Sequence, residues 1–256
     1  MLHANTFDVA EPLKRFTVAL ARHGDDVREA QRLRWRVFVE EQGARIATRE
    51  QGLDIDRFDE HCEHLLVRDR VTDTVIGTYR LLTARGAQAA GGFYSEQEFD
   101  IATLAPLRAG MVEMGRSCVH ADYRGGAIVA LLWSGLAAFL ARHGGTTLIG
   151  CASIPLADGG HHAASVYAAA LRSNPALATQ RVIPHRPLPL HELDATRAAA
   201  PPPLIKGYLR SGAVVCGAPA WDVDFNTADL FLMLELDQLA ARHARHFRRP
   251  AAEQAA

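Results

Sequence analysis

Residues 110–142 begin GMVEMGRSCVHADYRGG and continue as an apolar segment. The apolar residues at the start of this stretch indicate a strand, the glycines that follow indicate a turn, and the later apolar residues recur at helical spacing. Asp122 is the expected cap of the helix. The stretch therefore predicts a strand, a glycine turn and a helix, with two charged residues, Glu113 and Arg116, inside the strand.

The neighbouring segments extend this unit into an α/β fold. A strand is expected directly after the helix, and such a strand–helix–strand crossover requires the two strands to pair in parallel. A turn at residues 69–74 between two apolar runs predicts an antiparallel hairpin. The remaining elements are expected as strands at residues 16–20, 62–68, 75–82, 146–152, 214–216 and 229–236, and as helices at residues 27–41 (capped by Asp25 or Asp26), 95–104, 163–171 and 204–210.

Length and composition predict a single domain over residues 1–256, of which 48% are hydrophobic. A net charge of −1 argues against a general nucleic-acid binder. The four cysteines are widely spaced without a CxxC pair, and the chain shows no signal peptide, so we expect reduced thiols and a cytoplasmic location. No apolar run approaches the roughly 18 residues that span a bilayer, so any membrane contact is expected to be peripheral.

Two segments depart from this regular pattern. Residues 173–203 are rich in proline and have no clear period, which is typical of a functional lid or an ordered excursion. Residues 242–256 begin with a basic sequence and are expected to form a flexible tail.

Three charged residues lie in apolar surroundings, where charges are usually either paired or functional. Arg80 lies in one expected strand, and Glu113 and Arg116 lie in another. The last two have opposite parity, so a regular strand would point them to opposite faces. A bulge at Gly115 would turn both toward one cleft and splay the strand from its neighbour. We therefore expect chemistry here, with a buried ion cluster as the structural alternative.

Other motifs have weaker interpretations. The HCEH sequence at residues 61–64 has zinc-binding residue types, but alternate side chains of a strand point to opposite faces, so no metal is expected. The turn from Arg124 to Gly126 is either a phosphate cradle of backbone N–H groups or only a turn before a helix. No Gly-x-Ser-x-Gly motif is present, which argues against a serine hydrolase.

The order of these elements resembles the GNAT acyltransferase superfamily. A narrower pattern is similar to that of acyl-homoserine lactone synthases, through Arg34-x3-Phe38, Asp56-x-Phe58-Asp59, Arg80-Leu81-Leu82 and Glu113-x2-Arg116. The chain more closely resembles the ornithine-lipid N-acyltransferases, often called haemolysin-like, through EMGRSCVH at residues 113–120, PLIKGYLRSG at 203–212, WDVDFNTAD at 221–229 and an Arg-His-Phe tail. It departs from the lactone synthases around Ala44, where it lacks their tryptophan.

The resemblance implies a GNAT-like α/β fold, with a mostly antiparallel sheet, a splayed parallel junction and helices on both faces. It implies an acyltransferase that moves a fatty acyl group, 3-hydroxylated, from the acyl carrier protein to the α-amine of ornithine, giving lyso-ornithine lipid. The superfamily's pyrophosphate loop usually has glycine where Ala127 stands here and glycine or alanine where Val129 stands, and this looser turn suits the single phosphate of phosphopantetheine. No permanently bound cofactor and no metal are expected. The partners are then the acyl carrier protein, a small amino acid and, peripherally, the inner membrane.

On this resemblance each candidate residue receives a role. Glu113 is the candidate general base for the amine, and Arg116 would stabilise the oxyanion. Asp56 and Asp59 would hold the ammonium group of the amino acid, while Arg80 would fix their geometry or bind its carboxylate. The residues expected to meet the acidic carrier or its phosphopantetheine are Arg34, Arg36, Arg124, Gly125 and Gly126.

Two alternatives stay open. One is an acyl-homoserine lactone synthase or another amine acyltransferase. The other, from a different class, is a catalytically silent module that binds an acyl carrier or a membrane surface.

Overall fold

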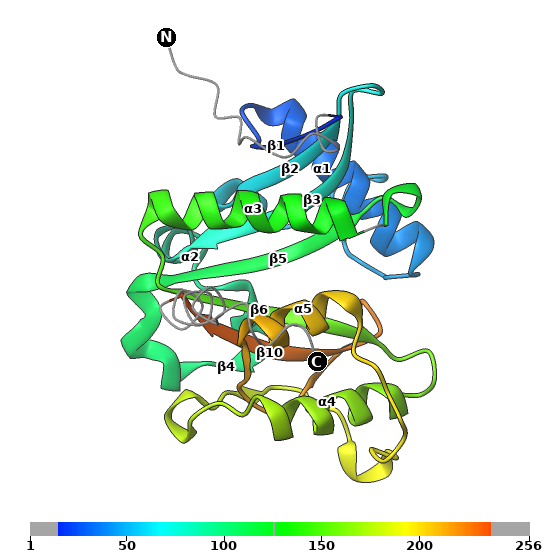
Figure 1. Cartoon of the computed structure of the whole chain (residues 1–256), viewed down its shortest axis with the longest axis vertical. Coiled ribbons are helices and arrows are strands. Elements are labelled where there is room, and N and C mark those ends of the chain that lie inside the picture. Colours follow the sequence, from blue (N-terminus) through cyan, green and yellow to red (C-terminus); the bar gives the residue numbers. More distant parts are fainter. Residues whose placement is uncertain (1–14, 125, 237–256) are drawn as a thin grey trace, which may run out of the picture. The chain divides into compact units, whose positions relative to one another are not determined.

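The computed structural model describes residues 15–124 and 126–236 (Figure 1). The chain divides into two compact units. Within the described residues, the first unit comprises residues 15–97, 112–145 and 222–226, and the second comprises residues 98–111, 146–221 and 227–236. The predicted α/β fold with mostly antiparallel strands is confirmed, whereas the single domain over residues 1–256 stays a prediction.

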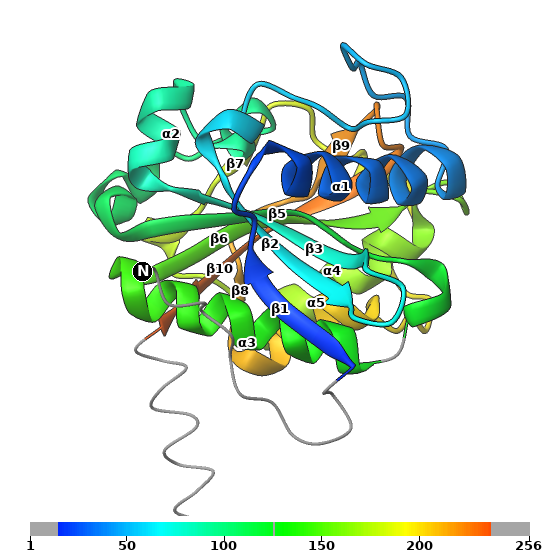
Figure 2. The ribbon, with the colours of Figure 1, turned by 90° about the horizontal axis from the view of Figure 1, so that it is seen from above.

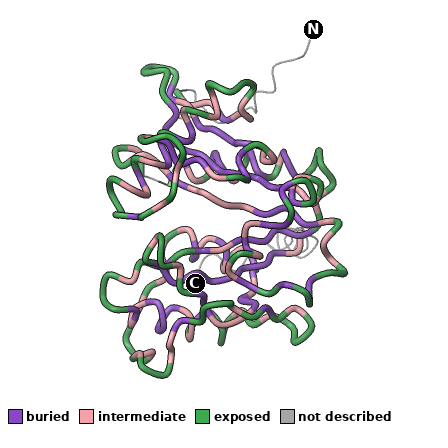
Figure 3. Tube along the Cα trace, turned by 180° about the vertical axis from the view of Figure 1, so that it is seen from behind, coloured by how far each residue is buried: buried purple, intermediate pink, exposed green. Residues whose placement is uncertain are grey.

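Four antiparallel strands form the sheet of the first unit. In order across the sheet they are β1 (Phe16–Leu20), β2 (Glu63–Asp69), β3 (Thr74–Thr83) and β5 (Met111–Val119). β2 and β3 form the hairpin expected from the turn between them. Most positions of both strands are buried, as expected for a sheet that is covered on each face. Figure 3 colours the described residues by burial.

Helices cover both faces of this sheet (Figure 2). α1 (Gly24–Trp35) lies on one face and α3 (Gly126–His143) on the other. A Cβ atom at Gly135 would lie 2.7 Å from Val18 and 2.8 Å from Leu65, so glycine lets α3 approach β1 and β2 closely. The smaller elements of the unit are α2 (Ala84–Ala90) and the 3-10 helices η3 (Asp59–His61), η4 (Tyr94–Gln97) and η6 (Ala121–Tyr123).

α3 corrects one expectation about the sequence. It is 18 residues long and apolar enough in composition to cross a membrane, although no such run was expected. One side of the helix is buried, however, from Ile128 to Leu140, where it packs on the strands of the first unit. We therefore interpret α3 as a core helix.

The second unit is built around a long antiparallel pair, β6 (Thr147–Pro155) and β10 (Thr227–Glu235). Short strands also pair with β10, and a single parallel bridge joins Pro175 to Val215. The other elements of this unit are β4 (Phe99–Asp100), β7 (Ile183–Pro184), β8 (Val214–Val215), β9 (Ala220–Asp222), α4 (His161–Ser173), α5 (Pro203–Ser211) and the 3-10 helices η5 (Ala102–Gly110), η7 (Ala178–Gln180) and η8 (Leu190–Glu192).

The proline-rich residues 173–203 form an ordered excursion within the second unit. β7 pairs with β4, and Val182 and Leu188 are buried, while Ile183 is 66% exposed. The segment is therefore neither a helix nor a solvated linker, and its role as a lid stays a prediction.

Three local expectations are wrong. The cap of α1 is His23, whose Nδ1 accepts the N–H of Asp26, and the helix continues as the π-helical stretch η2 (Arg36–Glu41). The helix expected at residues 95–104 is instead two 3-10 segments, η4 and η5, separated by β4. Asp122 lies in η6 rather than capping α3, because the turn between β5 and α3 forms its own 3-10 helix.

Candidate active site

A bulge in β5 shapes the centre of the site. Between two paired positions, β3 contributes the single residue Tyr79, whereas β5 contributes both Arg116 and Ser117. Arg116 absorbs the extra length with a left-handed backbone, at φ 49°. The predicted bulge is confirmed, but its left-handed residue is Arg116 and not Gly115. Such a conformation costs a non-glycine residue on the order of 1 kcal/mol or more, which points to a functional constraint.

Arg116 belongs to a closed ring of ion pairs that we call the Arg–Asp ring. Each arginine contacts two aspartates and each aspartate contacts two arginines, at nitrogen–oxygen distances between 2.6 and 3.3 Å. In sequence around the ring, the members are Arg34, Asp54, Arg116, Asp56, Arg80 and Asp59.

One side of the ring is closed to solvent. The Arg34 side chain from α1 is fully buried and contacts Asp54 at 3.0 Å and Asp59 at 2.9 Å. Asp59 also accepts a hydrogen bond from Gln31 at 3.1 Å. Burial opposes ionisation of Asp59, but the guanidinium of Arg34 prevails and lowers the pKa of that carboxyl well below its usual range. These contacts make Asp59 a structural anchor of the ring.

The opposite side of the ring is open at Asp56. Its side chain is 21% exposed, more than any other carboxylate of the ring, and it bridges two arginines. Oδ1 lies 2.6 Å from Arg80, and Oδ2 lies 3.3 Å from Arg116. Burial raises the pKa of Asp56, but the charges of these two arginines outweigh burial and lower it overall. Asp56 is therefore an ionised carboxylate within reach of solvent.

Glu113 lies in the same unit and holds the turn that carries Tyr94. Its side chain is 3% exposed, Oε2 accepts the N–H of Tyr94 at 2.6 Å, and Oε1 accepts the N–H of Ser95 at 2.8 Å. Burial raises the pKa of Glu113 in spite of these hydrogen bonds. Because a carboxylate has about four acceptor positions, Glu113 retains capacity to take a proton.

Two aromatic rings enclose the guanidinium of Arg116. Its carbon lies 4.9 Å from the ring centre of Tyr94 and 4.7 Å from that of Phe225. Phe225 comes from the turn at residues 222–226 and packs edge-on against Phe38 at 5.7 Å. Glu113 and Arg116 thus both contact Tyr94, Glu113 at its backbone N–H and Arg116 over its ring, whereas the prediction that both face one cleft stays a prediction.

The residues expected to meet an acyl carrier differ in how far they are exposed to solvent. Arg36 is exposed, as expected, but Arg34 is not: its ion pairs hold it in the core, so the expectation that it faces a carrier is wrong. Arg124 is 48% exposed and pairs with Glu41, and Gly126 begins α3. Gly125 and the tail at residues 242–256 lie outside the described residues.

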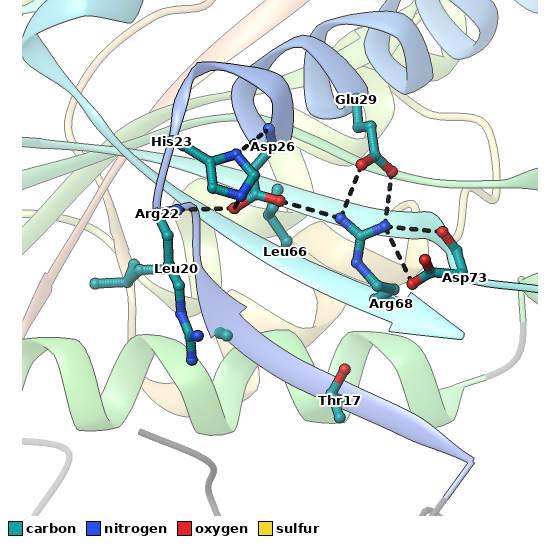
Figure 4. A pocket seen from close by; sticks show the side chains of 10 residues that line it. Thr17, Leu20, Arg22, His23, Asp26, Glu29, Leu66, Arg68 and Asp73 are labelled. Carbon is teal, nitrogen blue, oxygen red and sulfur yellow. Dashed lines mark hydrogen bonds and ion pairs between the residues drawn. The ribbon is translucent and has the colours of Figure 1, made fainter. Parts of the chain in front are cut away.

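A cavity of about 410 Å³ in the first unit lies apart from this chemistry (Figure 4). Arg68 lines it and pairs with Asp26 at 3.2 Å, Glu29 at 2.9 Å and Asp73 at 3.6 Å. Since these charges satisfy one another and no ring member lines the cavity, we assign it no catalytic role.

One group in the second unit has potential metal ligands. The ligand atoms of Glu98, Cys151 and Asp229 lie within 4.8 Å of one another. Asp229 already accepts hydrogen bonds from Ser153 and Thr227, so we assign no metal to this group.

Sequence reasoning missed three residues of the site. Asp54 closes the ring, and Tyr94 and Phe225 enclose Arg116. Asp54 stands two residues before Asp56 in an acidic stretch, which was a usable signal, because alternate residues of an extended segment share a face. Phe225 lies within the WDVDFNTAD motif at residues 221–229 but received no role from it, and Tyr94 gave no signal.

Comparison with known proteins identifies the family of this chain. Residues 33–134 match the family described as acetyltransferase (GNAT) domain. An L-ornithine N(alpha)-acyltransferase of Agrobacterium fabrum is 38% identical, covering 89% of this chain and 83% of the relative. Another, of Rhodobacter capsulatus, is 36% identical, covering 94% of this chain and 97% of the relative. The structure of an N-acyl amino acid synthase from uncultured soil microbes shares the fold, with a TM-score of 0.54, 15% identity and coverage of 89% and 93%. The chain is therefore a GNAT-type acyltransferase and belongs to the L-ornithine N(alpha)-acyltransferase family.

Proposed function

We propose that this enzyme transfers a fatty acyl group, 3-hydroxylated, from acyl carrier protein to the α-amine of L-ornithine, giving lyso-ornithine lipid. The acceptor is the one named for its relatives at 36–38% identity. The proposal rests on the solvent-exposed link of the Arg–Asp ring, by which we mean the two ion pairs that join Asp56 to Arg80 and to Arg116. No permanently bound cofactor and no metal enter the proposal.

An α-amino acid carries the charges needed to enter this link. Its ammonium group can take the place of an arginine beside Asp56, and its carboxylate can take the place of Asp56 beside Arg80 or Arg116. Asp56 is suited to this exchange because it is ionised and 21% exposed. Asp59, which was expected to share the role, is held by Arg34 and supports the ring from behind.

The amine must lose a proton before it attacks the thioester carbon. Glu113 is the proposed base, because burial raises its pKa toward that of the group it must deprotonate. Glu113 takes the first proton of the ammonium group. As the carbon–nitrogen bond forms and the carbon–sulfur bond breaks, the second proton lost by the nitrogen passes to the sulfur, which leaves as the pantetheine thiol. Arg116, held between two aromatic rings, is the proposed donor to the oxyanion.

The donor is proposed to bind at the turn before α3, with its phosphate near Arg124 and Gly126. Arg36 is exposed and basic, which suits an acidic carrier protein. We place the reaction in the cytoplasm, with peripheral contact to the inner membrane, where a lipid product can be released.

The test uses purified protein, acyl carrier protein loaded with a 3-hydroxyacyl chain, and ornithine. Mass spectrometry should detect Nα-acylornithine, and lyso-ornithine lipid should accumulate in a heterologous host that expresses the chain. Lactone formed from S-adenosylmethionine would select the acyl-homoserine lactone synthase instead. Acyl-carrier binding without transfer to any amine would select the silent module.

A further inference from the structure

Arg124 is already engaged by a carboxylate from another element. Its Nη2 donates to Oε2 of Glu41, and its Nε donates to the carbonyl oxygen of Val119 at 3.2 Å. Glu41 is the last residue of η2, and π-helical turns are frequent at functional sites. The Glu41 side chain is 27% exposed, so it faces solvent beside the turn that leads into α3.

We propose that Glu41 determines donor specificity by placing one negative charge beside the phosphate-binding turn. This inference rests on the proposed function, in which the donor phosphate lies near Arg124. A phosphopantetheine arm on a carrier protein brings one phosphodiester charge to that turn. Acyl-coenzyme A brings a diphosphate and a further phosphate, about four negative charges in all, and therefore meets a stronger repulsion from the Glu41 carboxylate.

The size of this effect follows from Coulomb's law. Two like charges about 6 Å apart in water-like surroundings change a binding constant by roughly threefold. The extra charges of coenzyme A lie farther from Glu41 and are partly screened, since the screening length is about 10 Å at 0.1 M salt. Removing the carboxylate should therefore strengthen the binding of acyl-coenzyme A about tenfold and that of acyl carrier protein about threefold.

The test compares Glu41→Gln with Glu40→Gln, which removes the same charge one residue earlier. Glu40 is exposed and has no ion pair among the residues that the structure describes. Both variants and the wild type are assayed with ornithine and one acyl chain, carried either by coenzyme A or by the carrier protein. We expect Glu41→Gln to raise kcat/KM about tenfold with acyl-coenzyme A and about threefold or less with the carrier, with the difference shrinking at high salt. Glu40→Gln should change either value less than about twofold.

Equal factors for both donors, or no change with either, would overturn the role of Glu41. Binding of coenzyme A and of 4′-phosphopantetheine, whose phosphomonoester carries about two negative charges against about four on coenzyme A, is measured separately by calorimetry for the wild type and both variants, which requires no turnover. If the wild type acylates ornithine from neither donor, the proposed function fails, while the calorimetric comparison still decides whether Glu41 discriminates between the two phosphate groups.

Discussion

Replacing Glu113 with glutamine tests the proposed base, and the structure shows that this substitution acts in two ways. The carboxylate accepts one backbone N–H with each oxygen, at 2.6 Å from Tyr94 and 2.8 Å from Ser95. An amide keeps one acceptor but turns a donor toward the other N–H, so one hydrogen bond to a charged group is lost, worth about 1.5–3 kcal/mol. Loss of a general base lowers turnover by about a hundredfold or more.

Glu96→Gln provides a matched control for the structural part. Oε2 of Glu96 accepts the N–H of Phe93 at 2.6 Å, so this carboxylate makes the same kind of hydrogen bond in the same region of chain. We expect Glu113→Gln to lower Tm by several degrees, since 1 kcal/mol is worth about 2–4 °C in a chain of this size. Glu96→Gln should lower Tm less, because its amide oxygen can still accept the N–H of Phe93. Only Glu113→Gln should also lower kcat by about a hundredfold.

The pH profile distinguishes a base from an anchor. Burial raises the pKa of Glu113, so the wild-type base is protonated at the acid end, and kcat should rise with pH through that pKa. This acid limb should be absent in Glu113→Gln and present in Glu96→Gln. Turnover of Glu113→Gln within about fivefold of wild type, with the acid limb intact, would refute the assignment and leave Glu113 as an anchor of the Tyr94 turn.

Four further predictions concern the ring, its aromatic contacts and the excursion. Asp59→Asn leaves Arg34 buried without full compensation and should cost about 3–5 kcal/mol of unfolding free energy at pH 7. Arg34 lowers the pKa of Asp59 in the folded state, so the contribution of Asp59 to the free energy of unfolding is present above the usual pKa of about 4 and is lost as pH falls. The unfolding free energies of variant and wild type, measured with denaturant, should therefore converge in acid. A difference between them that stays constant with pH would contradict this. Phe225→Leu removes one aromatic face from Arg116, worth about 0.5–2 kcal/mol, so steady-state kcat/KM should fall about 2- to 30-fold, and an unchanged value would show that the contact is not used. Ile183→Ala should leave Tm nearly unchanged, since Ile183 is 66% exposed, while slowing long acyl donors more than short ones; equal slowing would exclude a lid that contacts the acyl chain. Leu188→Ala removes a buried side chain and should cost about 2–5 kcal/mol in a denaturation experiment, so it is unsuitable as a specificity probe.

Periodicity was sufficient to predict most of the regular elements. The hairpin of β2 and β3 and the helix α3 follow from runs of apolar residues with turn residues between them. It was insufficient between β3 and β5, where backbone N–H groups donate hydrogen bonds to carboxylates such as Glu113 and so stabilise short 3-10 turns. Local capping of this kind leaves little trace in a hydrophobic pattern.

The members of the site could be predicted when they lie within strands, and less well when their partner comes from a loop that is distant in sequence. Arg80 and Arg116 were expected from charges inside apolar strands, and both are ring members. Arg34 was expected to meet the acyl carrier, because the sequence of α1 does not show that it pairs with Asp54 from the loop at residues 49–58. A guanidinium without that carboxylate would have had to remain in water.

The Arg–Asp ring has three positive and three negative members, so its formal charges sum to zero. A zwitterion that enters such a ring leaves the sum unchanged, whereas a simple amine or a simple carboxylate brings an unbalanced charge into a poorly solvated place. Under the proposed function, the α-ammonium and α-carboxylate of ornithine are neutral as a pair, and the third charge of ornithine, on its side chain, stays outside the ring. Electroneutrality would thus select for the amino-acid backbone and leave the identity of the side chain to residues beyond the ring.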